Sequence, residues 1–219
     1  MDIREILAPW VFRAAVVIGL SYPAIWGLGF GSEVMTIWKG AGVALLALWA
    51  AMLARDQDGW LLAAVMAFGA TGDVLLEIIS LDAGAAAFAA GHGVAIWLYA
   101  RNRRPVLTKS QLLLALLIVP ATVITAYLLP ADRDAAIGIA IYAAILSIMA
   151  AMAWTSRFPR YRTGIGAMLF VASDLLIFAR IGPIADTVTL GIAIWLLYFI
   201  GQWMIVIGVR SGLANDVIV

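Results

Sequence analysis

The sequence lacks cysteine and contains a single histidine, His92. Without cysteine the chain has no disulfide, no thiolate metal site and no cysteine nucleophile. With one histidine it can neither hold a haem between two of its own histidines nor build a multi-histidine metal site. We therefore expect no cofactor and no metal site built from cysteine or from several histidines, and the residue types left for chemistry are carboxylates, one histidine and one buried lysine.

Charge is also scarce in this chain. Charged residues make up 12% of its 219 residues, whereas a typical soluble domain has about 25%. The net charge is only +1, so no overall field attracts nucleic acid, and we expect no nucleic-acid partner. Because 65% of the residues are hydrophobic, the composition indicates a protein surrounded by a lipid bilayer.

Long hydrophobic runs, by contrast, are abundant. A run of about 18 or more apolar residues is long enough to cross a bilayer. Short polar stretches separate these runs, for example residues 101–104 and 157–160, and connections this short make consecutive helices antiparallel neighbours. The sequence predicts an all-α, polytopic membrane protein with eight transmembrane helices in one domain, residues 1–219. The expected spans are 8–29, 33–53, 60–80, 83–100, 111–129, 135–155, 164–180 and 187–209.

Two of the connections need comment. Residues 27–31 alternate glycine with apolar residues; we expect a turn there, not a phosphate-binding loop, because no lysine follows. The break between the third and fourth spans, near residues 80–83, carries little polarity. Its alternative is one continuous hydrophobic run, but a run of about 40 residues would be too long for a single span.

Lysine and arginine are divided unevenly between the two sides that this topology defines. Eleven lie on the side of the termini, and three, Lys39, Arg133 and Arg180, belong to the other side. Cytoplasmic loops are enriched in positive residues. We therefore expect both termini in the cytoplasm and a location in the cell membrane, the inner membrane of a bacterium.

A short internal similarity links the third and seventh spans. Residues 66–76 resemble residues 167–176, and the aspartates within them, Asp73 and Asp174, are 101 positions apart. Two interpretations stay open. One is a duplication that produced two parallel four-helix repeats, 1–105 and 106–219; the other is chance similarity between apolar segments.

Three charged residues fall well inside the expected spans: Lys39, Asp73 and Asp174. At about 1.5 Å per residue, each lies roughly 9–11 Å below the same membrane boundary, and Glu77 is one helical turn above Asp73. Facing lipid, each charge would be unfavourable by at least ~2.5 kcal/mol. We expect the three to converge on one internal polar site; the alternative is an ion-pair network that only locks helices together.

Several uncharged polar residues extend this candidate site. His92 lies near the middle of the fourth span among small residues, where it could hydrogen-bond between helices or take part in catalysis. Tyr198 and Gln202 form an i, i+4 pair on the last span, and Tyr22 has a comparable outer position on the first.

The polar residues occur in a pattern that resembles the YhhN-type lysoplasmalogenase family of eight-helix membrane proteins. Residues 72–76 (GDVLL) and 87–92 (AFAAGH) carry the resemblance, as do Ser173 with Asp174 and residues 198–202 (YFIGQ); the further matching positions are Arg180, Pro183 and Gly208. Lys39 matches a family lysine that is usually followed by proline. Here Gly40 replaces that proline, and Ala95 replaces an expected aromatic residue.

The resemblance implies hydrolysis of the vinyl ether bond of a lysophospholipid substrate, a lysoplasmalogen. Such an enzyme would release a fatty aldehyde and glycerophosphocholine or glycerophosphoethanolamine. We expect Asp73, Asp174 and His92 to be catalytic. The residues expected to bind substrate or support the site are Lys39, Glu77, Tyr22, Tyr198, Gln202 and Ser173. The alternative function is a small-solute or lipid transporter that uses its intramembrane carboxylates.

Overall fold

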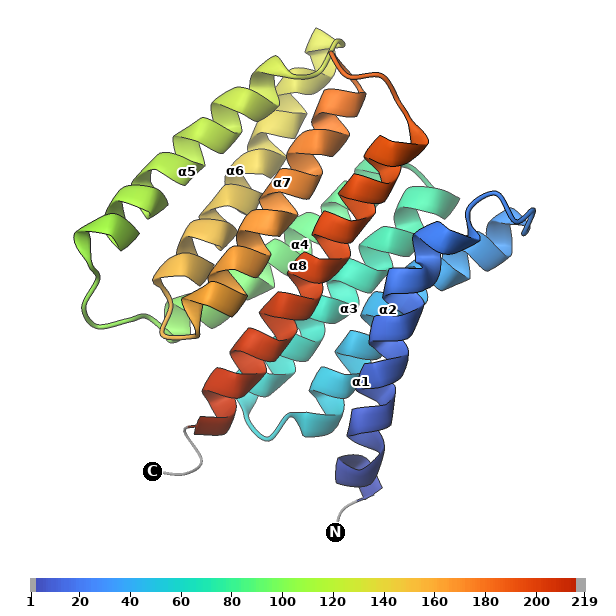
Figure 1. The fold of residues 1–219 in the computed structure, drawn as a ribbon. Helices are drawn as coiled ribbons and strands as arrows, with labels where there is room; N and C mark the ends of the chain where they lie inside the picture. The colour runs from blue at the N-terminus through green and yellow to red at the C-terminus, as the bar shows by residue number, and fades with distance from the viewer. Residues whose placement is uncertain (1–2, 216–219) are drawn as a thin grey trace. The chain divides into compact units, whose positions relative to one another are not determined.

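The computed structural model describes residues 3–215, which are almost entirely helical and contain no strand. The all-α fold class is therefore confirmed. The helices are α1 (Ile3–Ser21), α2 (Ser32–Leu53), α3 (Gln57–Ile78), α4 (Leu81–Arg101), α5 (Lys109–Leu128), α6 (Arg133–Thr155), α7 (Ile165–Arg180) and α8 (Val188–Asn215), with a 3₁₀ turn, η1 (Tyr22–Ile25), and a π-helical turn, η2 (Arg160–Gly164) (Figure 1).

Each predicted span corresponds to one of the eight α-helices. Seven helical segments are long and apolar enough to cross a membrane, as judged over the described residues: α2 to α6, α7 together with η2, and α8. The eighth, α1, has 19 residues and carries Arg4, Glu5 and Arg13. Seven or eight helices are thus suited to a multi-pass membrane protein, and the crossing by α1 stays a prediction, as do the orientation of the termini and the internal repeat.

The predicted ends of the first span are wrong. Helix α1 begins at Ile3, before the predicted start at residue 8, and includes Arg4 and Glu5. It ends at Ser21, just before η1, and not at residue 29. Pro23 lies at the start of η1, where its missing N–H cannot continue the α-helical ladder. The predicted turn at 27–31 is confirmed: Gly27 and Gly29 have φ values of 80° and 78°, which glycine adopts without a Cβ clash.

The chain does break between the third and fourth spans. Helix α3 ends at Ile78 and α4 begins at Leu81, so the alternative of one continuous run is excluded. Ser80 stabilises the new helix at its start. Its hydroxyl accepts a hydrogen bond from the Ala83 N–H at 3.1 Å, and its carbonyl accepts one from the Gly84 N–H at 3.1 Å, satisfying donors that a helix start leaves without partners.

The helices form two compact units. One ends at Leu98 and includes the chain again from Leu213; the other is Tyr99–Gly212. In the first unit α2 packs against both α1 and α3. Helices α3 and α4 approach closely through glycines: a Cβ on Gly72 would lie 2.7 Å from the Phe88 ring.

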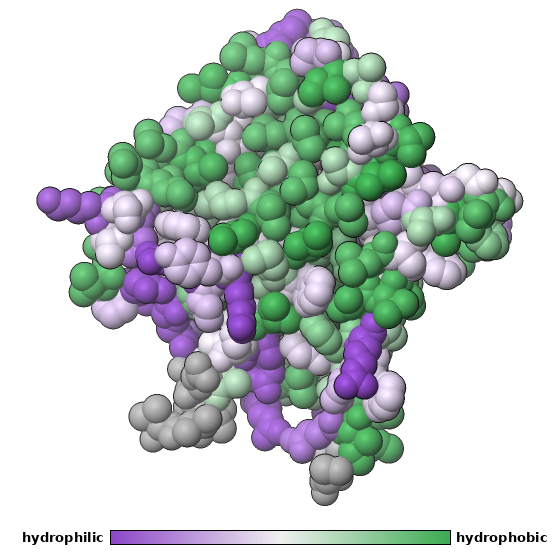
Figure 2. All heavy atoms as spheres, viewed as in Figure 1, coloured by the Kyte–Doolittle hydropathy of each residue, from purple (hydrophilic) through white to green (hydrophobic). Residues whose placement is uncertain are grey.

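The second unit contains α5, α6, α7 and most of α8. Its packed core includes Ala126, Ala143 and Phe178, from α5, α6 and α7. Helices α7 and α8 touch backbone to backbone, since a Cβ on Gly166 would lie 2.7 Å from the Gly201 carbonyl oxygen. The visible surface is mostly hydrophobic (Figure 2). Exposed leucines along α5, such as Leu116 at 63% exposure, suit contact with lipid.

Candidate functional site

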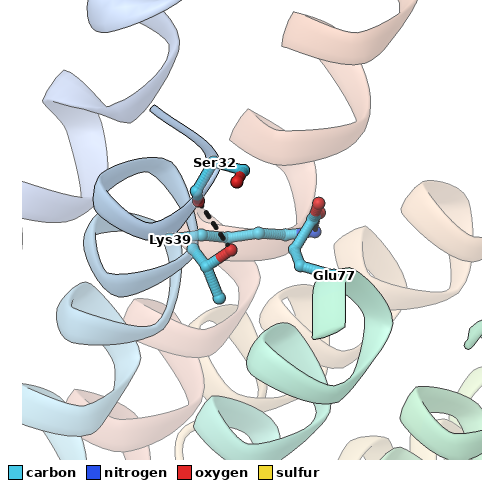
Figure 3. A network of polar contacts seen from close by, with 4 residues as sticks. Ser32, Lys39 and Glu77 are labelled. Atoms are coloured by element: carbon cyan, nitrogen blue, oxygen red, sulfur yellow. Dashed lines mark hydrogen bonds and ion pairs between the residues drawn. The ribbon is translucent and has the colours of Figure 1, made fainter. Parts of the chain in front are cut away.

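An ion pair joins α2 and α3 in the first unit. Lys39 Nζ donates a hydrogen bond to Glu77 Oε1 at 2.6 Å (Figure 3). The Lys39 side chain is 15% exposed and that of Glu77 is 43% exposed, so the pair lies at the edge of the packed helices. The carboxylate that meets this ammonium is thus Glu77, one turn above Asp73. Lys39, one of the charges predicted to lie inside a span, thus has a counter-ion within its own unit.

Asp73 lies deeper in the same region and is only 2% exposed. The helices are close here because Gly40 has no side chain: a Cβ at that position would lie 2.7 Å from Val74 Cγ2. A proline would remove the backbone N–H and kink the helix, whereas glycine lets α2 lie directly on α3. Gly40 thus allows close packing of α2 on α3 next to Lys39, the residue that pairs with Glu77 on α3.

Tyr22 belongs to the same group of polar residues. It lies in η1, is 7% exposed, and its ring packs edge-on against Trp26 with centroids 5.5 Å apart. Its hydroxyl is within electrostatic reach of both Glu77 and Asp73. We call Tyr22, Lys39, Asp73 and Glu77 the first-unit cluster. The structure thus brings together four of the residues that the sequence singled out.

His92 is buried in α4, with 4% of its surface exposed. The small residue before it allows close packing: a Cβ on Gly91 would lie 2.9 Å from Phe68 Cβ on α3. His92 therefore lies on a helix that α3 approaches closely, and α3 is the helix that carries Asp73. Its role in catalysis stays a prediction.

Asp174 has a well-defined partner in the second unit. Tyr142 Oη, on α6, donates a hydrogen bond to Asp174 Oδ2, on α7, at 2.6 Å. Asp174 is 6% exposed, and the Tyr142 ring packs edge-on against Phe178 with centroids 6.0 Å apart. A distance of 2.6 Å is typical of a strong hydrogen bond from a hydroxyl to a carboxylate. The phenol therefore fixes the position of this carboxylate.

Tyr142 is a candidate site residue that was not predicted from the sequence. A usable signal was present, because the sixth and seventh spans were expected to be antiparallel neighbours. A tyrosine seven residues after the start of the sixth span and an aspartate six residues before the end of the seventh lie within about 2 Å of each other in depth, at about 1.5 Å per residue. A hydroxyl at matching depth on a neighbouring helix is a natural partner for a buried carboxylate.

Ser173 connects α7 to α8. Its hydroxyl donates a hydrogen bond to the Ile194 carbonyl oxygen at 3.0 Å, which anchors the backbone next to Asp174. On α8, Tyr198 packs edge-on against Phe170 with centroids 5.1 Å apart, and Gln202 is 2% exposed. We call Tyr142, Ser173 and Asp174 the second-unit cluster.

The expected convergence of Asp73 with Asp174 stays a prediction, because the two aspartates belong to different units. Within residues 3–215, no group of three or more histidine, aspartate and glutamate side chains is arranged to hold a metal ion. What each unit offers is a buried carboxylate, with an ammonium nearby in the first unit and a phenol hydrogen-bonded to it in the second.

A search of curated proteins and a search of solved structures both found no match. A family model, described as the YhhN family, matches residues 34–209, which include all of the second-unit cluster and all of the first-unit cluster except Tyr22. The family that the sequence resembles is thus confirmed, and this chain belongs to the YhhN family.

Proposed function

We propose that the protein hydrolyses the vinyl ether bond of lysoplasmalogens, releasing a fatty aldehyde and glycerophosphocholine or glycerophosphoethanolamine. The observation that carries the proposal is a pair of buried aspartates, Asp73 and Asp174, within apolar helices of a YhhN family member. A carboxylate buried in a membrane is energetically unfavourable, so its presence favours a functional role. Acid–base catalysis of vinyl ether hydrolysis is a role that uses two carboxyl groups.

The reaction requires an acid and a base but no covalent nucleophile. A proton adds to the vinyl carbon remote from the ether oxygen, and the carbon bonded to that oxygen becomes part of an oxocarbenium ion. Water attacks this carbon and gives up a proton to a carboxylate. In the resulting hemiacetal the hydroxyl group loses its proton to a carboxylate as the bond to the glycerol oxygen breaks, which forms the aldehyde. The glycerol oxygen takes a proton from a carboxyl group and leaves as the alcohol.

Two carboxyl groups can divide these tasks between them. One, in its protonated form, acts as the general acid, while the other, ionised, stabilises the cation and accepts the proton from water. Asp73 and Asp174 fill these two roles, in an order that the proposal leaves open. Tyr142 donates a hydrogen bond to Oδ2 of Asp174, so in this proposal the phenol acts as a positioning residue for that carboxyl group.

The Lys39–Glu77 pair matches the charges of the substrate headgroup. Phosphocholine and phosphoethanolamine each carry one negative phosphate and one positive ammonium group. Lys39 can meet the phosphate, and Glu77, the more exposed partner, can meet the ammonium. Substrate binding would exchange one ion pair for two, with the lipid chain lying among the apolar helices.

The direct test is release of free aldehyde by purified protein. Three samples would be compared: the lysoplasmenyl lipid, its ester-linked analogue, and no lipid. We expect aldehyde from the vinyl ether alone, and a loss of about 100-fold or more in Asp73→Asn and in Asp174→Asn, as removal of a general acid or base produces. Asp82→Asn and Asp134→Asn, which change exposed aspartates at helix starts, are the matched controls and should retain activity.

Two results would reject the proposal. One is the absence of aldehyde with protein that is folded and incorporated in lipid. The other is full activity in both Asp73→Asn and Asp174→Asn. Movement of lipid across a vesicle membrane without aldehyde release would instead favour the transporter function.

A further inference from the structure

The second unit carries most of its positive charge at one end. The α4–α5 and α6–α7 loops with the helix ends that flank them, and the last part of α8, contribute eight basic residues and no acidic one. These are Arg101, Arg103, Arg104, Lys109, Arg157, Arg160, Arg162 and Arg210, which we call the basic rim. The acidic residues of this unit lie elsewhere, with Asp174 inside α7 and the others in the connections at the opposite end.

The two loops of the basic rim are bonded to each other. The Arg157 N–H donates to the Asn102 carbonyl oxygen at 2.8 Å, and Arg157 Nε donates to Asn102 Oδ1 at 2.6 Å. The Arg104 N–H donates to the Thr155 carbonyl oxygen at 3.4 Å. Asn102 is 4% exposed, so it acts as a buried link between the loops. The rim is therefore a platform of fixed shape and not two independent flexible loops.

Three arginines of this platform have no acidic partner. Within the part of the chain that the structure describes, no carboxylate pairs with Arg103, Arg160 or Arg162. Arg103 and Arg162 are exposed, and Arg160 is half-buried. Their guanidinium groups thus remain available to an anion from outside the protein, and guanidinium matches phosphate oxygens in geometry as well as in charge.

Exposed apolar residues are interleaved with these charges. Val106 is 78% exposed and Tyr161 is 66% exposed. Tyr161 lies between Arg160 and Arg162, and the Arg160 guanidinium lies over its ring at 4.9 Å from the centroid. Apolar and aromatic residues beside arginines are typical of the membrane interface, where rings sit at headgroup level.

We propose that the basic rim binds the headgroups of anionic phospholipids in the adjoining leaflet, in preference to zwitterionic ones. The rim lies at the ends of helices that are suited to crossing the membrane, which is where basic clusters meet lipid phosphates. This binding is distinct from that of the proposed substrate, which is zwitterionic. It would hold the α4–α5 and α6–α7 loops together and, through η2, fix the start of α7, the helix that carries Asp174.

The test measures which lipids stay with the protein. Full-length protein would be extracted from vesicles of equal parts phosphatidylglycerol and phosphatidylcholine, and the retained lipid would be quantified by mass spectrometry. We expect enrichment of phosphatidylglycerol, reduced about five-fold for each arginine removed, since each basic residue near the surface contributes about 1 kcal/mol. The variants are Arg103→Gln, Arg162→Gln and the triple change with Arg160→Gln.

Two kinds of control variant test whether the position and the charge of the rim arginines determine the enrichment. Arg133→Gln removes an exposed arginine at the opposite end of the unit and should leave the enrichment unchanged. Arg103→Lys and Arg162→Lys keep the positive charge and should retain most of the phosphatidylglycerol enrichment. Equal retention of both lipids by the unaltered protein would overturn the proposal, as would undiminished enrichment in the triple variant. Loss of enrichment in the presence of millimolar inorganic phosphate would also overturn the proposal, because the rim would then be a site for soluble anions.

Discussion

At the scale of single residues, the hydrogen bond from Tyr142 to Asp174 has the most direct consequence for chemistry. A hydrogen bond to a charged group contributes about 1.5–3 kcal/mol, which corresponds to roughly 10- to 150-fold in rate if it acts in the transition state. We expect Tyr142→Phe to lower kcat for aldehyde release by about that factor and to leave KM nearly unchanged. Steady-state kinetics on the lysoplasmenyl lipid would measure both.

A readout independent of activity distinguishes positioning from general damage. Loss of the phenol removes a donor to the Asp174 carboxyl group, so its infrared C=O or carboxylate band should shift in Tyr142→Phe and disappear in Asp174→Asn. Tyr127→Phe alters an exposed tyrosine and is the control. An unchanged band with reduced kcat would contradict the positioning role.

The exposed carboxylate of Glu77 leads to a prediction about headgroup choice. If Glu77 meets the substrate ammonium, Glu77→Gln should raise KM for choline and ethanolamine lipids by up to about five-fold, since exposed ion pairs contribute up to about 1 kcal/mol. For a substrate that ends in a bare phosphate, Glu77→Gln should leave KM unchanged. The ratio of kcat/KM for the two substrates measures the effect. Glu33→Gln, at the exposed start of α2, should leave this ratio unchanged; an equal change in both variants would count against the assignment.

The sequence could identify the charged members of the site but not all of their partners. Lys39, Asp73 and Asp174 were predictable because a charge is conspicuous in an apolar span. The Tyr142 contact was harder, since it depends on how α6 is rotated about its own axis. A helix that is apolar on all sides carries little information about that rotation. The Lys39–Glu77 contact likewise depended on the close approach of α2 and α3 at Gly40.

At the scale of helices, the contact between α7 and α8 is the most sensitive to side-chain size. A Cβ on Gly166 would lie 2.7 Å from the Gly201 carbonyl oxygen and 3.0 Å from the Ile205 nitrogen, and backbone atoms cannot move aside as side chains can. We expect Gly166→Ala to destabilise the protein by about 1–3 kcal/mol, as overpacking does. Thermal or denaturant unfolding in detergent would measure this.

Gly138 provides the matched control, because a Cβ there would meet nothing within 4 Å. Gly138→Ala should leave stability unchanged or raise it by up to about 1 kcal/mol, since alanine favours helix more than glycine does. Equal effects of the two substitutions would show that the close α7–α8 contact does not limit stability.

The hydrophobic runs predicted the existence and order of all eight helices, because length and apolarity decide both. Their ends were less predictable. Helix α5 begins at Lys109, before the expected residue 111, because Thr108 and Gln111 form a capping box whose polar side chains extend the helix beyond the apolar run. The π-helical turn η2 could not be foreseen, since no local residue pattern in residues 160–164 distinguishes it from an α-helical start.

At the scale of the whole molecule, the membrane topology can be tested with unusual clarity. The chain has no cysteine, so each introduced cysteine is the only one that a maleimide can label. We expect a membrane-impermeant maleimide, added to intact cells, to label Ser80→Cys but not Ser110→Cys until the cells are permeabilised. Labelling of Ser110→Cys alone would reverse the predicted orientation.

The crossing of α1 needs its own pair of sites. Ile3→Cys and Phe30→Cys lie at the start of α1 and in the turn after it, and both positions are exposed. If α1 spans the membrane, only Phe30→Cys should react from outside. If both react alike, α1 does not cross, and the protein has seven spans.

The central claim is that buried carboxylates protonate a vinyl ether carbon, and the mass of the aldehyde formed in D₂O tests it most directly. The aldehyde would be trapped as it forms, before its own hydrogens exchange. The mechanism predicts one deuterium on the carbon next to the aldehyde group, and no product above background in Asp73→Asn or Asp174→Asn. Aldehyde without deuterium, or no aldehyde from folded protein, would contradict the account.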